Sequence, residues 1–220
     1  MTLSAESFVA ELDAKNRSAL DRIAAGASQG EPDASLTVTR LLMLALKNEM
    51  EATECAAAWI GSTPETDVKL ALARQAGDEA KHYRLIQKRL GELGVATDAH
   101  DPMAAGRSPL ASYLLSLEGT VARVAAGQFT REGLAVVRNA EFIRYCHARG
   151  DDATARLYEE TIQPDERHHH ELGRTLLVRL ATTAEAQEAA SAASARVLAL
   201  ADELQELARL KMGISRAPGC

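Results

Sequence analysis

Apolar residues recur at helical spacing along most of the chain, and they predict a series of long helices. Residues 4–25 carry a loose pattern of this kind, which ends in a Ser-, Gly- and Pro-rich stretch that reaches Pro32. Residues 33–60 carry a longer pattern, which is closed by Gly61. We expect the first segment to form a lead-in helix and the second to form the first helix of a bundle.

A second bundle helix is predicted from Thr63 to Leu93. Thr63 is followed by Pro and Glu, so the segment begins with a capping hydroxyl, a fixed backbone dihedral and a negative charge. The helical pattern stops before Gly94. Residues 95–109 contain Asp, Gly and Pro with little periodicity, which is typical of a crossover connection rather than a tight turn.

The second half of the chain repeats this layout. Residues 110–149 are helical by composition, but one helix of ~40 residues would be ~60 Å long, too long for one bundle helix. We therefore predict a break near Gly119 or Gly127. A Gly-Asp-Asp turn then leads into a helix over residues 153–181, and an Ala-, Leu- and Glu-rich tail helix follows over residues 184–212.

The composition supports an all-α fold. The chain has 220 residues and 46% hydrophobic content, enough to bury one substantial core. Aromatic residues make up only 4%, whereas Ala, Leu, Glu and Arg, which lose little rotamer freedom in a helix, are abundant. We expect one domain over residues 1–220, with a core at 33–181, a lead-in at 1–32 and a tail at 182–220.

Charge and hydropathy exclude several kinds of partner. The formal net charge of -6 gives no extended positive surface for a nucleic-acid backbone. No segment approaches the ~20 apolar residues of a membrane-spanning helix, and residues 1–10 do not resemble a secretion signal. We therefore expect a cytoplasmic protein with neither a nucleic-acid nor a membrane partner. Cys55, Cys146 and Cys220 form no Cys-x-x-Cys pair and are predicted to be free thiols.

The sequence Asp-Glu-x-x-His occurs at residues 78–82 and again at residues 165–169. Residues three apart on a helix lie on one face with their Cβ atoms about 5–6 Å apart, so the Glu and His of one copy can bind one metal ion. A single copy is common by chance, but a pair is informative. The residues concerned are Glu79, His82, Glu166 and His169.

A further glutamate precedes each motif by the length of one helical hairpin. Glu49 precedes Glu79, and Glu132 precedes Glu166, and both upstream segments read Glu-x-x-Ala. Antiparallel helices would bring all of these groups to one level of a bundle. The second spacing is longer than the first, so Glu141 stays open as an alternative to Glu132.

This pattern resembles that of the ferritin-like di-iron carboxylate superfamily, which includes ferritins, rubrerythrins, aldehyde-deformylating oxygenases and bacterial tRNA-modifying hydroxylases. The resemblance covers residues 33–176. It implies a ferritin-like antiparallel four-helix bundle with a long crossover, to which this chain adds an N-terminal and a C-terminal helix. It also implies that Glu49 and Glu132 are terminal carboxylate ligands, Glu79 and Glu166 bridging ligands, and His82 and His169 imidazole ligands.

The donor types indicate which metal to expect. Carboxylate oxygens with one imidazole per ion suit iron or manganese, and they make a poor structural zinc site. We expect two iron ions, with manganese as the alternative. The chain departs from the superfamily in having Ala56 where many relatives have an aromatic residue, and it lacks the four-cysteine module of a complete rubrerythrin.

Residues beside the motifs have their own predicted roles. Asp78 and Asp165 are each predicted either to accept a hydrogen bond from the His of the other motif or to be solvated. His168 and His170 point about 100° away from His169 on a helix, so we do not expect them to bind metal.

Two further pairs of residues lie near the motifs in sequence. Glu51 and Glu54 lie off the helix face of Glu49, so they are expected to face solvent or to sit behind the ligands. Tyr83 and Tyr158 are expected to pack in the core.

The resemblance leaves three functions to test. The first is an oxygen-dependent oxidoreductase, supplied by an electron donor, that acts on an organic substrate in an adjoining apolar pocket. The second is oxidation of iron or removal of peroxide without an organic substrate. The third is a metal-free helical scaffold whose tail helix binds a partner. The extra helices would obstruct the packing of a hollow cage, so we expect a homodimer.

Overall fold

The computed structural model describes residues 2–28, 36–212 and 218–219, and within these ranges it is helical and contains no strand. The all-α prediction is therefore confirmed. Three predicted features lie outside the described residues: the end of the lead-in at Pro32, the first residues of the predicted bundle helix, and Cys220. The helical segments are α1 Ala5–Ser28, α2 Val38–Ile60, α3 Thr66–Glu92, α4 Pro109–Ser116, α5 Thr120–Val124, η1 Ala125–Arg131, α6 Glu132–His147, α7 Asp152–Leu157, η2 Tyr158–Ile162, α8 Gln163–Leu180 and α9 Ala184–Met212.

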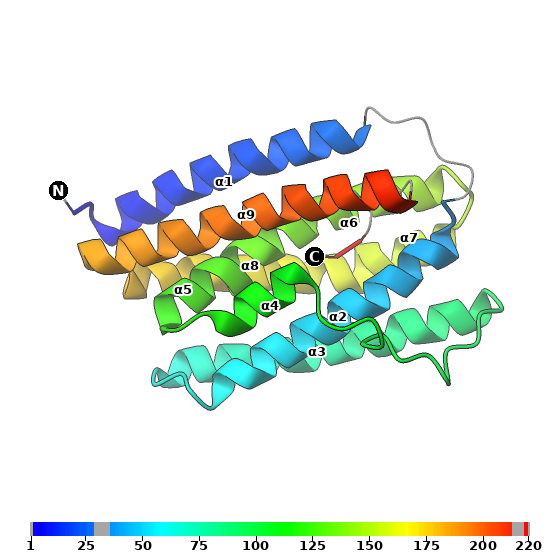
Figure 1. Cartoon of the computed structure of the whole chain (residues 1–220), viewed down its shortest axis with the longest axis horizontal. Helices are drawn as coiled ribbons and strands as arrows, with labels where there is room; N and C mark the ends of the chain where they lie inside the picture. The colour runs from blue at the N-terminus through cyan, green and yellow to red at the C-terminus, as the bar shows by residue number, and fades with distance from the viewer. Residues whose placement is uncertain (1, 29–35, 213–217, 220) are drawn as a thin grey trace.

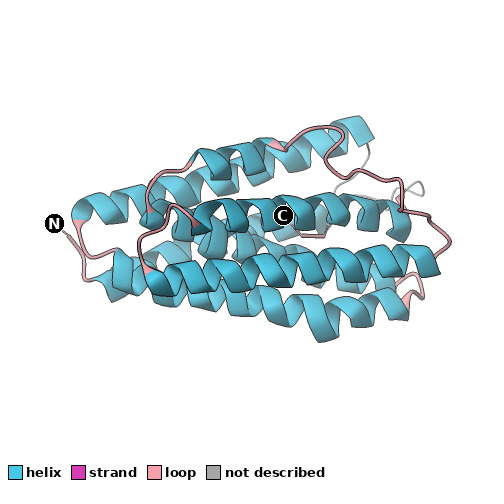
Figure 2. Ribbon diagram, turned by 90° about the horizontal axis from the view of Figure 1, so that it is seen from below, coloured by secondary structure: helices cyan, strands magenta, loops and turns pink. Residues whose placement is uncertain are grey.

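Two long helical hairpins face each other. Helices α2 and α3 form the first hairpin, and the second pairs the continuous run α5–η1–α6 with the run α7–η2–α8. Helix α3 packs on α8, which joins the hairpins, while α1 and α9 lie side by side against the second hairpin (Figure 1). Seen from below, the helices run roughly along one axis (Figure 2). Among the described helices, none is both long and apolar enough to cross a membrane.

Side-chain hydroxyls lie at the ends of α2, but the cap predicted for the start of α3 is not formed. Thr37 accepts a hydrogen bond from the Arg40 backbone N–H at 3.2 Å at the start of α2. Thr63 was expected to cap α3, but that prediction is wrong, because the capping position is Glu65, whose side chain makes no capping bond. The Thr63 hydroxyl donates instead to the Trp59 carbonyl at 2.9 Å, so it closes the end of α2.

The predicted break in the second half occurs at Gly119. This glycine has a φ of 80°, in the left-handed region that favours glycine, and it separates α4 from α5. Gly127 lies instead inside η1, where a Cβ would stand 2.7 Å from the Trp59 ring. Gly127 therefore leaves room for the Trp59 ring to pack against η1, and it does not mark a break.

Segments η1 and η2 are wound as π-helices, with more residues per turn than an α-helix. Segment η1 ends directly before Glu132, and η2 ends shortly before Glu166. Such turns change which side chains of the following helix face inward. The π turns therefore contribute to the orientation of two of the predicted ligands.

The apolar core is divided by a polar layer. One apolar cluster contains Trp59, Leu72 and Phe129, and another contains Leu46, Ile86 and Phe142. On each of the helices involved, the predicted ligand lies between the residues of the two clusters in sequence. The fold thus places the predicted ligands at one depth, between two regions that exclude water.

Candidate metal centre

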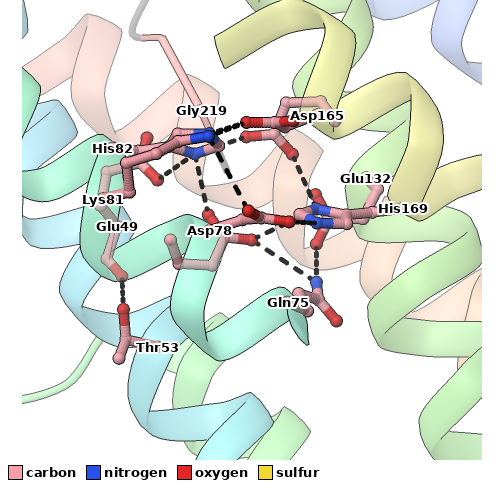
Figure 3. A network of polar contacts seen from close by, with 12 residues as sticks. Glu49, Thr53, Gln75, Asp78, Lys81, His82, Glu132, Asp165, His169 and Gly219 are labelled. Carbon is pink, nitrogen blue, oxygen red and sulfur yellow. Dashed lines mark hydrogen bonds and ion pairs between the residues drawn. The ribbon is translucent and has the colours of Figure 1, made fainter. Parts of the chain in front are cut away.

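All six side chains predicted from the sequence come together in the polar layer. Figure 3 labels four of them, which are Glu49, His82, Glu132 and His169. They form two overlapping groups, and within each group one possible donor atom per residue lies within 4.8 Å of the others. None of the six is more than 3% exposed, so they are not solvated surface groups. Position A is defined by Glu49, Glu79, His82 and Glu166, and position B by Glu79, Glu132, Glu166 and His169.

Glu79 and Glu166 belong to both positions, and each of them presents a different oxygen to each imidazole. His82 Nδ1 lies 3.4 Å from Glu79 Oε2 and 3.6 Å from Glu166 Oε1. His169 Nδ1 lies 3.7 Å from Glu79 Oε1 and 3.9 Å from Glu166 Oε2. This is the arrangement needed for two carboxylates to bridge a pair of ions.

Glu49 and Glu132 each belong to one position. Glu49 Oε2 lies 3.5 Å from His82 Nδ1, in position A. Glu132 lies in position B, whereas its alternative Glu141 belongs to neither group and lies 3.9 Å from Arg144. Of the two alternatives left open by the sequence, the structure brings Glu132 to the cluster.

Five buried polar atoms at this centre have no hydrogen-bond partner among the residues that the structure describes. Leaving such an atom unsatisfied costs about 1–3 kcal/mol, and more when the group is charged. Cations that bind here would satisfy all five, and hard carboxylate oxygens with one imidazole per position suit iron or manganese. The donor set therefore fits a pair of metal ions. The five atoms are Glu79 Oε2, His82 Nδ1, Glu132 Oε2, Glu166 Oε2 and His169 Nδ1.

Asp78 and Asp165 orient the two imidazoles. His82 Nε2 lies 3.1 Å from Asp165 Oδ2, and His169 Nε2 lies 3.1 Å from Asp78 Oδ2. A carboxylate accepts a hydrogen bond, so each Nε2 carries a proton, which leaves each Nδ1 as the nitrogen that can offer a lone pair to a bound cation. Each aspartate thus serves the His of the other motif, which is the first of the two roles predicted for it.

Gln75 and Arg131 also contact the centre, and neither is predicted from the sequence. Gln75 Nε2 donates to Glu132 Oε1 at 2.6 Å, and Arg131 Nη1 donates to the same oxygen at 2.8 Å. Gln75 could have been found, because it lies one helical turn before Glu79 and on the same face. Arg131 gave no such signal, since its inward direction follows from the π winding of η1.

Most of the other neighbours lie as predicted. His168 is exposed, and His170 Nδ1 lies 2.7 Å from the Phe129 carbonyl, so neither joins the metal-binding groups. Tyr158 is fully buried and packs edge-on against Phe142.

The two acidic neighbours of Glu49 fix the crossover. Glu51 accepts hydrogen bonds from the backbone N–H and the hydroxyl of Ser108, at 2.6 and 2.7 Å. It is buried, so it does not face solvent, which was the first of the two positions expected for it. Glu54 pairs with Arg107 at 2.9 Å. Both glutamates therefore hold the end of the crossover segment against α2.

Burial and mutual repulsion determine the protonation of the cluster. Burial raises the pKa of Glu49 to about 7, and burial with the charge of Glu79 raises the pKa of Glu166 well above its usual value. Burial also acts to raise the pKa of Glu79, but contact with His82 and the charge of Arg131 outweigh it and lower that pKa. Burial acts to lower the pKa of His82, but contacts with Glu49 and Glu79 raise it to about 11. Without cations, the cluster therefore holds protons.

The metal-free protein is expected to lose stability as the pH rises from about 6 to about 9. The folded-state pKa values of Glu49 and His82 lie above their usual values of 4.5 and 6.5. Their contribution to stability is complete below those usual values and is lost as the pH rises through about 7 and towards about 11. Thermal unfolding with a chelator at several pH values measures this fall. Added Mn(II) is expected to reduce it, because cations replace protons. A rise in stability over the same range with chelator would contradict this account.

Fold and centre together define a class: a helical protein with a buried carboxylate and imidazole cluster that can hold metal ions. Comparison with protein-family models, curated proteins and solved structures found no match to this chain.

Proposed function

We propose that this chain is a ferritin-like di-iron protein that acts as an oxygen-dependent oxidoreductase. The observation that carries the proposal is the pair of overlapping donor groups, which share Glu79 and Glu166 and are buried between two apolar clusters. Glu49 and Glu132 would be the terminal carboxylates of positions A and B, and His82 and His169 their imidazoles. Two hairpins joined by a crossover support the ferritin-like assignment.

Iron is the proposed metal, and manganese is the alternative. Each position offers three carboxylates and one imidazole. The thiols of Cys55 and Cys146 are in neither group, and burial raises their pKa values to about 11 and about 12, so they stay protonated and do not compete as ligands.

A bound iron pair would supply one-electron redox chemistry with dioxygen. The protein's own part is positional. The shared carboxylates hold both positions together, the Asp78 and Asp165 contacts fix the imidazole rings, and the apolar clusters on either side exclude bulk water. This rigid, dry setting limits side reactions of an oxidised site.

The size of the cavities that described residues line beside position B favours a second candidate function, in which iron itself or peroxide is the substrate. Two cavities of about 10 Å³ each border Arg131 beside position B, and each has the size of one water molecule. Cys55 and Leu114 line both of them. Dioxygen, peroxide and water fit spaces of this scale better than an organic substrate does.

Anaerobic loading with Fe(II), followed by oxygen, tests the proposed function. We expect two iron ions per chain and a transient visible absorbance as the iron is oxidised. Iron that binds but shows no oxygen-dependent spectral change would refute the oxidoreductase. Continued oxidation of excess Fe(II) would select the second candidate, and a protein that binds no metal after reconstitution would be a metal-free scaffold. Light scattering of the same sample measures the expected homodimer.

A further inference from the structure

We propose that Arg131 makes the two metal positions unequal, so that position A fills before position B. This inference rests on the proposed function, because it concerns how the same centre loads its ions. Each position has the same set of donors, three carboxylates and one imidazole, but the residues around the two positions differ.

Arg131 touches oxygens that belong to position B. Its Nη1 lies 2.8 Å from Glu132 Oε1 and 3.9 Å from Glu79 Oε1. Glu79 Oε1 is the oxygen that faces His169, the imidazole of position B. Arg131 is only 7% exposed, so water screens its charge weakly. A cation in position B must therefore bind beside a buried positive charge.

Among the residues that the structure describes, none gives position A an equivalent cation. Asn48 precedes Glu49 in the chain as Arg131 precedes Glu132, and Asn48 is uncharged. Its amide donates to the Pro218 carbonyl at 2.9 Å. Within the described part of the chain, the ion pair of Glu49 is made with His82, which is itself a proposed ligand. Over the described residues, the two positions thus have matching donors but differ by one formal charge.

The contacts of Glu132 add a second difference. Gln75 and Arg131 both donate to its Oε1, which leaves Oε2 as the buried oxygen without a hydrogen-bond partner. Glu132 is therefore held so that it offers one oxygen to an ion. A fixed single-oxygen donor next to a guanidinium is a weaker ligand for a cation than an unpaired carboxylate.

Titration of the metal-free protein with Mn(II), followed by electron paramagnetic resonance, tests this inference. At one equivalent, the wild type is expected to show isolated Mn(II), and the second equivalent is expected to convert it to a coupled pair. Arg131→Gln is expected to tighten the second dissociation constant by about tenfold or more and to change the first much less. Arg131→Lys keeps the charge and is expected to keep the two affinities apart. Arg89→Gln removes another partly buried arginine, which pairs with Asp151 away from the cluster, and is the matched control.

Two ligand variants locate the tighter position even if Arg131→Gln does not fold. Glu132→Gln is expected to keep the tight ion and lose the weak one, and Glu49→Gln is expected to lose the tight ion. The inference is overturned if both wild-type ions bind with equal affinity, if Arg131→Gln leaves the second constant unchanged, or if Glu132→Gln loses the tight ion. A wild type that binds no metal would overturn the proposed function as well, so the two failures are distinguishable.

Discussion

Glu166→Gln is expected to abolish binding of both iron ions. Glu166 is a member of position A and of position B, and each of its oxygens faces a different imidazole. An amide cannot replace a bridging carboxylate, because it has one neutral acceptor oxygen and a donor in place of the other. Elemental analysis after anaerobic loading and desalting is expected to fall from two ions per chain to none.

The same measurement on single-position variants sharpens this result. Glu49→Gln and Glu132→Gln are each expected to retain one ion, since each removes a ligand of one position only. Glu141→Gln is the matched control and is expected to retain both, because Glu141 lies outside the two groups. Loss of metal in Glu141→Gln, or two ions retained in Glu166→Gln, would contradict the ligand assignment.

Failure to fold is not the expected reason for metal loss in Glu166→Gln. Burial and neighbouring carboxylates raise the pKa of Glu166 well above its usual value, which favours the protonated form of this side chain in the metal-free protein. Glutamine has nearly the same shape and charge as a protonated glutamate. The variant is therefore expected to unfold at a temperature close to that of the wild type when both are measured with a chelator.

Asp165→Asn is expected to weaken metal binding at position A by about 10–100-fold. The carboxylate of Asp165 accepts a hydrogen bond from His82 Nε2 and so directs the Nδ1 lone pair to the cluster. An asparagine can present its amide N–H instead, which favours the tautomer that protonates Nδ1. Asp78→Asn is expected to act in the same way on His169 and position B.

Mn(II) titration shows which metal position each aspartate substitution weakens. It also separates this local effect from the effect of removing one negative charge. Asp67→Asn serves as the control, because Asp67 pairs with Arg179 at the protein surface and is expected to leave both affinities unchanged. Equal weakening by all three substitutions would show that net charge, rather than ring orientation, controls affinity. No weakening in Asp165→Asn would show that the contact with His82 does not matter for binding.

The sequence predicted the helices and the six clustered side chains, because both follow from local periodicity. A Glu and a His three residues apart share a helix face whatever the fold, and a hairpin-length spacing brings in Glu49 and Glu132. The hydrogen bond from the His of one motif to the Asp of the other was one of the two roles predicted for Asp78 and Asp165. These features depend on spacing along helices that run for several turns.

Features that depend on tertiary packing were not predicted. Spacing arguments assume α-helical winding, so the sequence did not reveal the π turns of η1 and η2. Segment η2 lies between Glu132 and Glu166, and its wider turns use more residues for the same helix length. This contributes to the longer spacing between these two glutamates, and because of that spacing Glu141 remained an alternative to Glu132. The buried contacts of Arg131 and the direction of Thr63 likewise depend on neighbours far apart in sequence.

The crossed pairing of the motifs has a thermodynamic consequence. Position A takes Glu49, Glu79 and His82 from the first hairpin and Glu166 from the second, and Asp165 of the second hairpin holds the His82 ring. Neither hairpin can therefore assemble a complete position alone. Metal binding and docking of the two hairpins would therefore be linked equilibria. Metal removal would loosen the α3–α8 interface first and would leave the packing within each hairpin largely intact.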